Sequence, residues 1–265
     1  MTESVTTQER PDVGAAETPG SAAAWTVEPR DRPLLSSGTF DRQSGALRTW
    51  RGNAELIAEV LEMFHPPGTP GLVADVTYGR GVWWRECREP DVRHGLDVAG
   101  SGDEFNDGVD FRHLPEADGT FAVVAFDPPY TATGSPSKHA SVGDMRHRFG
   151  IALPTTPAGI QHELINPGLT EVHRVLAPGG LALVKVKNYI SGGRLWAGEF
   201  YTLAHAVTLD MDLVAHYVYV GRPGPQPSKR GKAETAHRAQ HPRSNTSSLF
   251  VLRRMAPLET QEALL

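Results

Sequence analysis

The sequence predicts a doubly wound α/β fold with a mostly parallel sheet of seven strands. Short apolar runs recur along the chain, and an acidic residue stands at or just after the end of several of them. Segments with the apolar spacing of helices separate some of these runs, as expected where helices connect parallel strands. Two apolar runs near the end of the chain predict an antiparallel hairpin at the sheet edge.

The first expected element is a helix over 53–64, whose apolar residues recur at helical spacing and which Pro66 and Pro67 should end. Buried strands and their connections follow. A later helix is expected over 201–209, and the chain has no internal repeat. The expected strands are 71–76, 92–97, 121–126, 181–186, 213–220 and 248–253.

A glycine-rich turn follows the first strand. Gly79 and Gly81 lie between this strand and a helix start at 82–86. Because glycine lacks a Cβ atom, the turn can be tight and a bound molecule can lie against it. The G-x-G spacing lacks the third glycine of the dinucleotide fingerprint, so a plain strand-to-helix turn is an equal alternative.

Acidic residues follow the strands in order. Asp75 ends the first strand, and Asp97 ends the second about twenty residues after the glycine turn, where a carboxylate can accept from both hydroxyls of a ribose. Asp110 can accept from an adenine amine while Phe111 covers the ring. Each carboxylate alone can be a solvated loop residue, but their order indicates a nucleotide-cofactor site.

The segment Asp127-Pro128-Pro129-Tyr130 directly follows the apolar run 121–126. Two prolines make this turn rigid, and because they lack N–H groups the turn offers acceptors. Asp127 adds an ionised acceptor and Tyr130 a flat face for stacking. A structural turn is the alternative, but a site for the exocyclic amine of a heteroaromatic ring fits these groups.

These segments together resemble the S-adenosylmethionine-dependent amino-methyltransferases that act on nucleic acid. The run 75–81 is similar to their cofactor-binding motif, Asp97 to their ribose acid, and Asp110 and Phe111 to their adenine contacts. The segment 127–130 matches their catalytic D-P-P-Y motif. The resemblance implies the class I methyltransferase fold, S-adenosyl-L-methionine as the cofactor and nucleic acid as the partner.

The resemblance covers about residues 52–254. It extends to 169–180, which is similar to the helix and glycine turn that such folds place before the strand 181–186. One position departs from the pattern: Thr77 stands where many DNA-modifying members carry phenylalanine, so the methionine end of the cofactor is expected to be held differently.

Length and composition agree with a single enzyme domain. The chain has 265 residues and one cysteine, Cys87, which excludes a disulfide framework and is expected to be a packed residue. No apolar stretch approaches membrane-spanning length, so a cytoplasmic protein is expected. Residues 1–35 are expected to be a disordered tail, 36–254 the methyltransferase domain and 255–265 a second tail.

Two long segments are candidates for recognising the target, 131–167 and 222–243. The net charge of −5 argues against a generally basic coat but allows a local basic face. A solubilising loop is the alternative for the second segment. Its basic residues, expected to contact phosphates, are Arg222, Lys229, Arg230, Lys232, Arg238 and Arg243.

Two further pairs of residues stand out by their spacing. His237 and His241 have i, i+4 spacing, but no third ligand is evident and no metal is expected. Lys185 and Lys187 lie at alternate positions of one strand, which is unusual in a parallel sheet. They either point toward the substrate cleft or extend to the surface.

The expected reaction is direct methyl transfer to the exocyclic amine of a flipped base, with adenine N6 favoured over cytosine N4 and DNA over RNA. Asp127 and the carbonyl of Pro128 accept the two N–H groups, and Tyr130 stacks on the base. Three alternatives remain open: an RNA methyltransferase, a methyltransferase for a protein or small-molecule amine, and a binding module without catalysis. Protein partners and oligomeric state are not predicted.

Overall fold

The computed structural model describes residues 49–95, 108–130, 154–191, 194–221 and 246–256. All of them belong to the unit Thr49–Leu265. The expected N-terminal tail, and the C-terminal tail from residue 257, lie outside the described residues.

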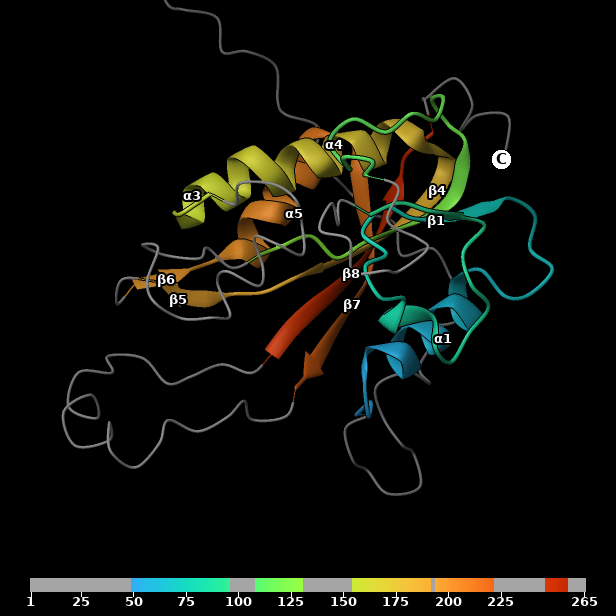
Figure 1. The fold of residues 1–265 in the computed structure, drawn as a ribbon, viewed down its shortest axis with the longest axis horizontal. Helices are drawn as coiled ribbons and strands as arrows, with labels where there is room; N and C mark the ends of the chain where they lie inside the picture. Colours follow the sequence, from blue (N-terminus) through green and yellow to red (C-terminus); the bar gives the residue numbers. More distant parts are fainter. Residues whose placement is uncertain (1–48, 96–107, 131–153, 192–193, 222–245, 257–265) are drawn as a thin grey trace, which may run out of the picture. The chain divides into compact units, whose positions relative to one another are not determined.

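A six-stranded sheet forms the centre of the described structure (Figure 1). Its first four strands are parallel, and each pairs with the next in the order β2, β1, β3, β4. Beyond β4 the direction reverses, because β8 is antiparallel to both β4 and β7. In spatial order the strands are β2 (Val92–Arg93), β1 (Leu72–Asp75), β3 (Phe121–Phe126), β4 (Leu176–Val186), β8 (Thr246–Arg254) and β7 (Met211–Val220).

Within the described residues the central sheet has six strands, against the expected seven. The second expected strand, 92–97, is shortened to the two residues of β2, and residues 96–107 after it lie outside the described part. At the other end of the sheet β8 lies between β4 and β7, and β7 is the edge strand, with Leu213 opposite Leu252. The segment that joins β7 to β8 is also outside the described residues.

Both faces of the sheet are covered, as the alternation of side chains along β3 shows. Val124 and Phe126 belong to a core cluster with η2 (Ile160–Ile165), α4 (Asn166–Val175) and α5 (Gly198–Thr208). Val123 and Ala125 belong to a second cluster, with α1 (Asn53–Phe64) and η1 (Val82–Trp84). Because neighbouring side chains of a strand point to opposite faces, the two clusters lie on opposite sides of the sheet.

The helices agree with the sequence in part. Helix α1 has the expected bounds and ends before Pro66. The expected helix start at 82–86 is a single 3₁₀ turn, η1. The second half of the expected recognition segment 131–167 is not a loop, because α3 (Pro157–Gly159) and η2 lead directly into α4.

Capping and burial account for that helix. Thr156 Oγ1 accepts a hydrogen bond of 3.0 Å from the backbone N–H of Gly159, and Pro157 occupies the first turn. Ile160, Leu164 and Ile165 are buried against the sheet. These signals were present in the sequence, but the polar stretch before them hid the start of the helix.

A small two-stranded sheet follows β4 and was not predicted. Its strands, β5 (Tyr189–Ser191) and β6 (Arg194–Trp196), are antiparallel, with Tyr189 opposite Trp196. None of the helices in the described part of the chain is both long and apolar enough to cross a membrane.

Candidate active site

The glycine turn and the D-P-P-Y segment adjoin at the carboxyl ends of two neighbouring strands. Strands β1 and β3 are parallel, with Asp75 opposite Ala125. Beyond this pair, the backbone N–H of Asp127 donates a 2.7 Å hydrogen bond to Thr77 Oγ1. The residue that departs from the family pattern thus connects the two predicted motifs.

Asp75 is buried and its carboxylate is used within the protein. Its Oδ1 accepts from the backbone N–H of Thr77 at 2.8 Å, and its Oδ2 accepts from Trp84 Nε1 at 2.6 Å. Burial raises the pKa of Asp75 to about 7, and the charge of Asp127 adds to this shift, although the hydrogen bonds from Trp84 and Thr77 oppose it. In this position Asp75 shapes the turn.

Both predicted glycines of the turn have positive φ angles, +55° for Gly79 and +60° for Gly81. A Cβ atom on Gly81 would lie 2.5 Å from the hydroxyl of Tyr78, so no other residue fits without a shift. A Cβ atom on Gly79 would meet only the carbonyl oxygen of Thr77, at 3.8 Å. The turn therefore has an open side at Gly79, where a ligand can approach the backbone.

The carboxylate of Asp127 has one oxygen near a cation and one without a partner. Lys185, on β4, is only 6% exposed, and its Nζ lies 3.9 Å from Asp127 Oδ2. Among the described residues, neither the buried Oδ1 nor the buried Nε1 of Trp83 has a hydrogen-bond partner. Burial raises the pKa of Asp127, and Lys185 opposes the shift.

Trp83 lies close to the same carboxyl group. Its indole is near enough to Asp127 to lower the pKa of the carboxyl, yet the two groups do not reach hydrogen-bond geometry. A buried donor and a buried acceptor therefore lie close together, and each can pair with a ligand or, after a small shift, with the other. Two unpaired buried polar atoms at one place are uncommon in proteins and indicate a binding site.

The rest of the D-P-P-Y segment is packed. Pro128 and Pro129 are buried, and Tyr130 is half-buried against the cluster that contains Phe126. Burial raises the pKa of the Tyr130 hydroxyl, and Asp127 adds to the shift. Tyr130 therefore remains a neutral phenol with part of its surface accessible.

Two of the other predicted cofactor contacts already interact with residues of the protein itself. Both carboxylate oxygens of Asp110 accept from Arg112, the shortest contact being 2.6 Å. Burial works to raise the pKa of Asp110, but the Arg112 hydrogen bonds outweigh it and the net shift is downward. Phe111 is 3% exposed and packs edge-on against Phe126 at 5.4 Å, within the core. Asp97 lies outside the described residues.

The six basic residues of 222–243 that are expected to contact phosphates lie outside the described part of the chain. His237, His241 and residues 131–153 also lie outside it. Within the described ranges, no group of three or more His, Cys, Asp or Glu side chains could hold a metal. Burial, together with the charges of Glu89 and Glu86, raises the pKa of Cys87 to about 11, so its thiol is protonated at neutral pH.

The largest difference from the sequence-based site is the pair Trp83 and Trp84. One leaves its indole N–H unpaired near Asp127, and the other binds Asp75. The only signal was their place directly after the glycine turn. For Lys185 the structure decides between the two alternatives: its side chain is buried beside Asp127 and does not extend to the surface.

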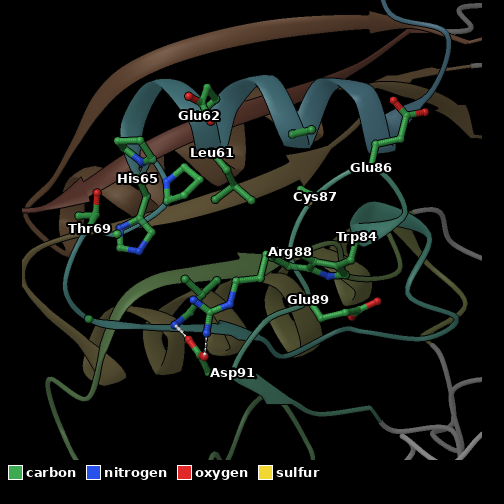
Figure 2. A pocket seen from close by; sticks show the side chains of 16 residues that line it. Leu61, Glu62, His65, Thr69, Trp84, Glu86, Cys87, Arg88, Glu89 and Asp91 are labelled. Carbon is green, nitrogen blue, oxygen red and sulfur yellow. Dashed lines mark hydrogen bonds and ion pairs between the residues drawn. The ribbon is translucent and has the colours of Figure 1, made fainter.

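A separate cavity of about 340 Å³ lies between the end of α1 and residues 84–91 (Figure 2). Asp91, which Arg88 contacts at 2.7 Å, and His65 are among its lining residues. Trp84 also lines it, but Asp127, Tyr130 and the two glycines of the turn do not. The cavity is therefore distinct from the site at the carboxyl ends of β1 and β3.

Comparisons with known proteins give only distant similarity. No protein-family model matches the chain, and no curated protein matches its sequence. Among solved structures, a protein of Thermus thermophilus described provisionally as a DNA modification methylase, complexed with S-adenosyl-L-methionine, is 14% identical with a TM-score of 0.37. The match covers 58% of this chain and 56% of that one, less than two thirds of its length.

Two other structures are similar to the same degree. The PvuII DNA methyltransferase, which is cytosine-N4-specific, is 15% identical over 56% of this chain and 48% of its own, with a TM-score of 0.37. The [4+2]-cyclase SpnF is 14% identical over 83% of this chain and 87% of its own, with a TM-score of 0.44. Similarity at this level does not establish an activity.

Proposed function

We propose that this protein transfers a methyl group from S-adenosyl-L-methionine to an exocyclic amine of a base in nucleic acid. The observation that carries the proposal is the free Oδ1 of Asp127, held next to the glycine turn by the hydrogen bond from Asp127 N–H to Thr77 Oγ1. An acceptor for an amine and a turn for a cofactor then lie side by side.

The residues around the turn fit a nucleotide cofactor. Gly79 leaves open space on one side, and Trp83 Nε1 is a buried donor without a partner among the described residues. When bound, S-adenosyl-L-methionine supplies an electrophilic methyl group. Asp97 is proposed to bind the ribose, and Asp110 to approach the adenine, although Arg112 already occupies much of its carboxylate.

The proposed roles of the segment 127–130 fit the chemistry of its groups. Asp127 Oδ1 accepts one N–H of the target amine, and the carbonyl of Pro128 accepts the other. These two bonds orient the nitrogen lone pair and favour the positive charge that develops on nitrogen. Tyr130 stacks on the base, and the charge of Lys185 favours the ionised form of Asp127. Cys87, protonated at neutral pH, is not suited to the covalent chemistry that methylation of a ring carbon requires.

Adenine N6 is the favoured target over cytosine N4, and DNA the favoured polymer over RNA. The amine of a paired base is out of reach, so the base must leave the stack. The basic residues of 222–243 are proposed to contact phosphates. A phosphate-binding loop of this kind separates the proposal from a methyltransferase for a protein or small-molecule amine.

The test uses purified protein, radiolabelled S-adenosylmethionine, and separate pools of unmodified duplex DNA, single-stranded DNA and total RNA. The product is digested to nucleosides to identify the labelled base. Asp127→Ala is the catalytic variant, and Asp212→Ala, which removes an exposed carboxylate on β7, is the matched control. Calorimetry with the cofactor is run in parallel on all three proteins.

The expected result is label in N6-methyldeoxyadenosine that is lost in Asp127→Ala and kept in Asp212→Ala. Label in N4-methyldeoxycytidine would identify cytosine as the target base, and label in RNA alone would identify RNA as the substrate. Cofactor binding without transfer to any pool would refute the nucleic-acid proposal and leave a different acceptor or a module without catalysis.

A further inference from the structure

Partly exposed aromatic side chains gather beyond the carboxyl end of β4. Trp196, on β6, stacks on Tyr201, on α5, with ring centroids 4.7 Å apart and an interplanar angle of 29°. Phe200 contacts Tyr201 edge-on at 5.6 Å. Phe200 is 66% exposed and Tyr201 is 40% exposed. We name these three residues the aromatic platform.

A cavity of about 390 Å³ opens beside the platform. Its volume is in the range of small-molecule sites. Its walls are mostly apolar and aromatic, with the guanidinium of Arg194 as the cation and the hydroxyl groups of Thr156, Ser191 and Tyr201 as further polar atoms. The lining residues are Thr156, Pro157, Ala158, Ser191, Arg194, Leu195, Trp196 and Tyr201.

The platform is held against the catalytic end of the sheet (Figure 1 shows β5 and β6 beside α5). The backbone N–H of Glu199 donates to Asn188 Oδ1 at 3.1 Å, and Asn188 Nδ2 donates to Glu199 Oε2 at 2.8 Å. A Cβ atom on Gly198 would lie 2.7 Å from the carbonyl oxygen of Lys187, two residues after Lys185. The start of α5 is therefore fixed to the strand that carries the cation beside Asp127.

We propose that the aromatic platform binds an unpaired base of the strand that carries the target amine, with Arg194 next to a phosphate of that strand. This inference rests on the proposed function, and it specifies the partner as nucleic acid with unstacked bases. Every base has a flat π-face, so stacked aromatic rings bind unpaired bases without sequence preference. An arginine beside them complements the charge of the backbone.

A second copy of this chain is the alternative occupant of this surface, and the aromatic composition of the platform favours a base. A stable interface between two proteins buries a large area on each partner, whereas a base needs only one exposed ring and a nearby cation. Phe200 and Tyr201 supply the rings, and Arg194 is exposed. The platform should therefore favour single-stranded over fully paired nucleic acid.

The experiment measures the dissociation constant of a fluorescein-labelled oligodeoxyadenylate of about 12 nucleotides by fluorescence anisotropy at fixed salt. This length lies within the range of about 4–16 nucleotides that one single-strand-binding domain covers. Phe200→Ser removes the most exposed ring of the platform. Val207→Ser is the matched control, because Val207 is 70% exposed on the same helix, α5. A second oligonucleotide of the same length carries abasic sites in place of bases.

We expect Phe200→Ser to weaken binding of the base-containing strand by about tenfold and to leave binding of the abasic strand unchanged. Val207→Ser should behave as the wild type on both strands. Equal effects of the two substitutions, or equal losses of affinity for the two strands, would refute the proposed role of the platform. Wild-type protein that binds neither strand would overturn it as well.

The two proposals fail separately. Methyl transfer that is observed while Phe200→Ser binds normally keeps the proposed function and rejects the platform. Binding that depends on Phe200 without any methyl transfer keeps the platform and rejects the proposed function. Sedimentation velocity completes the test: an oligomer that Phe200→Ser dissociates would assign this surface to a second copy of the chain.

Discussion

Lys185 Nζ lies 3.9 Å from Asp127 Oδ2, and the two residues belong to neighbouring parallel strands, β4 and β3. Burial alone would favour the protonated form of Asp127, in which one carboxyl oxygen carries a proton and no longer serves as an acceptor. The ammonium of Lys185 opposes this and occupies only one side of the carboxylate. The buried Oδ1 has no partner among the described residues, and the cation beside Oδ2 favours the ionised form of the carboxyl.

Replacing Lys185 with methionine should move the acidic limb of the rate profile to higher pH. Without the cation, burial raises the pKa of Asp127 further, so a more alkaline solution is needed to ionise it. At pH 7 we expect kcat to fall on the order of tenfold, with recovery as the pH rises. The measurement is single-turnover methyl transfer as a function of pH.

Lys187→Met is the matched control, since it removes the same charge two residues along the chain, just beyond the end of β4. Its profile should keep the wild-type midpoint. Identical profiles for Lys185→Met and the wild type would show that the ion pair does not tune Asp127. Calorimetry with the cofactor checks that both variants retain a formed site.

Asp75 should make the fold less stable as the pH rises. Its pKa is about 7 in the folded protein, above the ordinary value of 3.8, so the protonated form favours folding. This contribution is complete below about pH 4 and disappears as the pH passes through 7. Its size is on the order of 4 kcal/mol at most. Urea unfolding at pH 4.5 and pH 8 measures the loss.

Asp75→Asn keeps the size of the side chain and cannot titrate, so its stability should change less between the two pH values than that of the wild type. Asp212→Asn, on the exposed side of β7, should retain the wild-type dependence. The same pH dependence in Asp75→Asn and the wild type would mean that other groups cause it.

Thr77→Val should lower both stability and rate. The hydroxyl accepts the backbone N–H of Asp127 at 2.7 Å, and valine leaves this donor without its partner. An unpaired donor at a half-buried position costs about 1–3 kcal/mol of unfolding free energy. Thr77→Ser keeps the hydroxyl and should stay close to the wild type, as thermal unfolding and methyl transfer will show. A stable and fully active Thr77→Val protein would contradict the role given to the hydrogen bond between Asp127 N–H and Thr77 Oγ1.

The two glycines of the turn should respond differently to alanine. Both positive φ angles cost about 1–2 kcal/mol for an alanine. Gly81→Ala adds a contact of 2.5 Å with Tyr78 and should be the less stable variant. Gly79→Ala meets no such contact but fills the open side of the turn, so it should lose cofactor affinity more than stability. Urea unfolding and calorimetry separate the two effects.

The elements that could be predicted are those with local causes. Helix α1 and strand β3 have the expected bounds, because apolar spacing and adjacent prolines act within a few residues. The helix from Pro157 was missed, since its cap and buried face follow a polar segment without a pattern. The hairpin β5–β6 was missed because its short strands are held by Asn188 and Glu199.

Sequence by itself determined the acid at the end of β1, the glycine turn after it and the position of the D-P-P-Y segment after β3, because each is a local run of residues with local geometric needs. Tertiary structure decided which of these side chains are free. Asp75 and Asp110 are occupied by Trp84 and Arg112, whereas one oxygen of Asp127 is not. Such pairings depend on strands and turns that meet only after folding, and burial then sets the charge of each carboxyl.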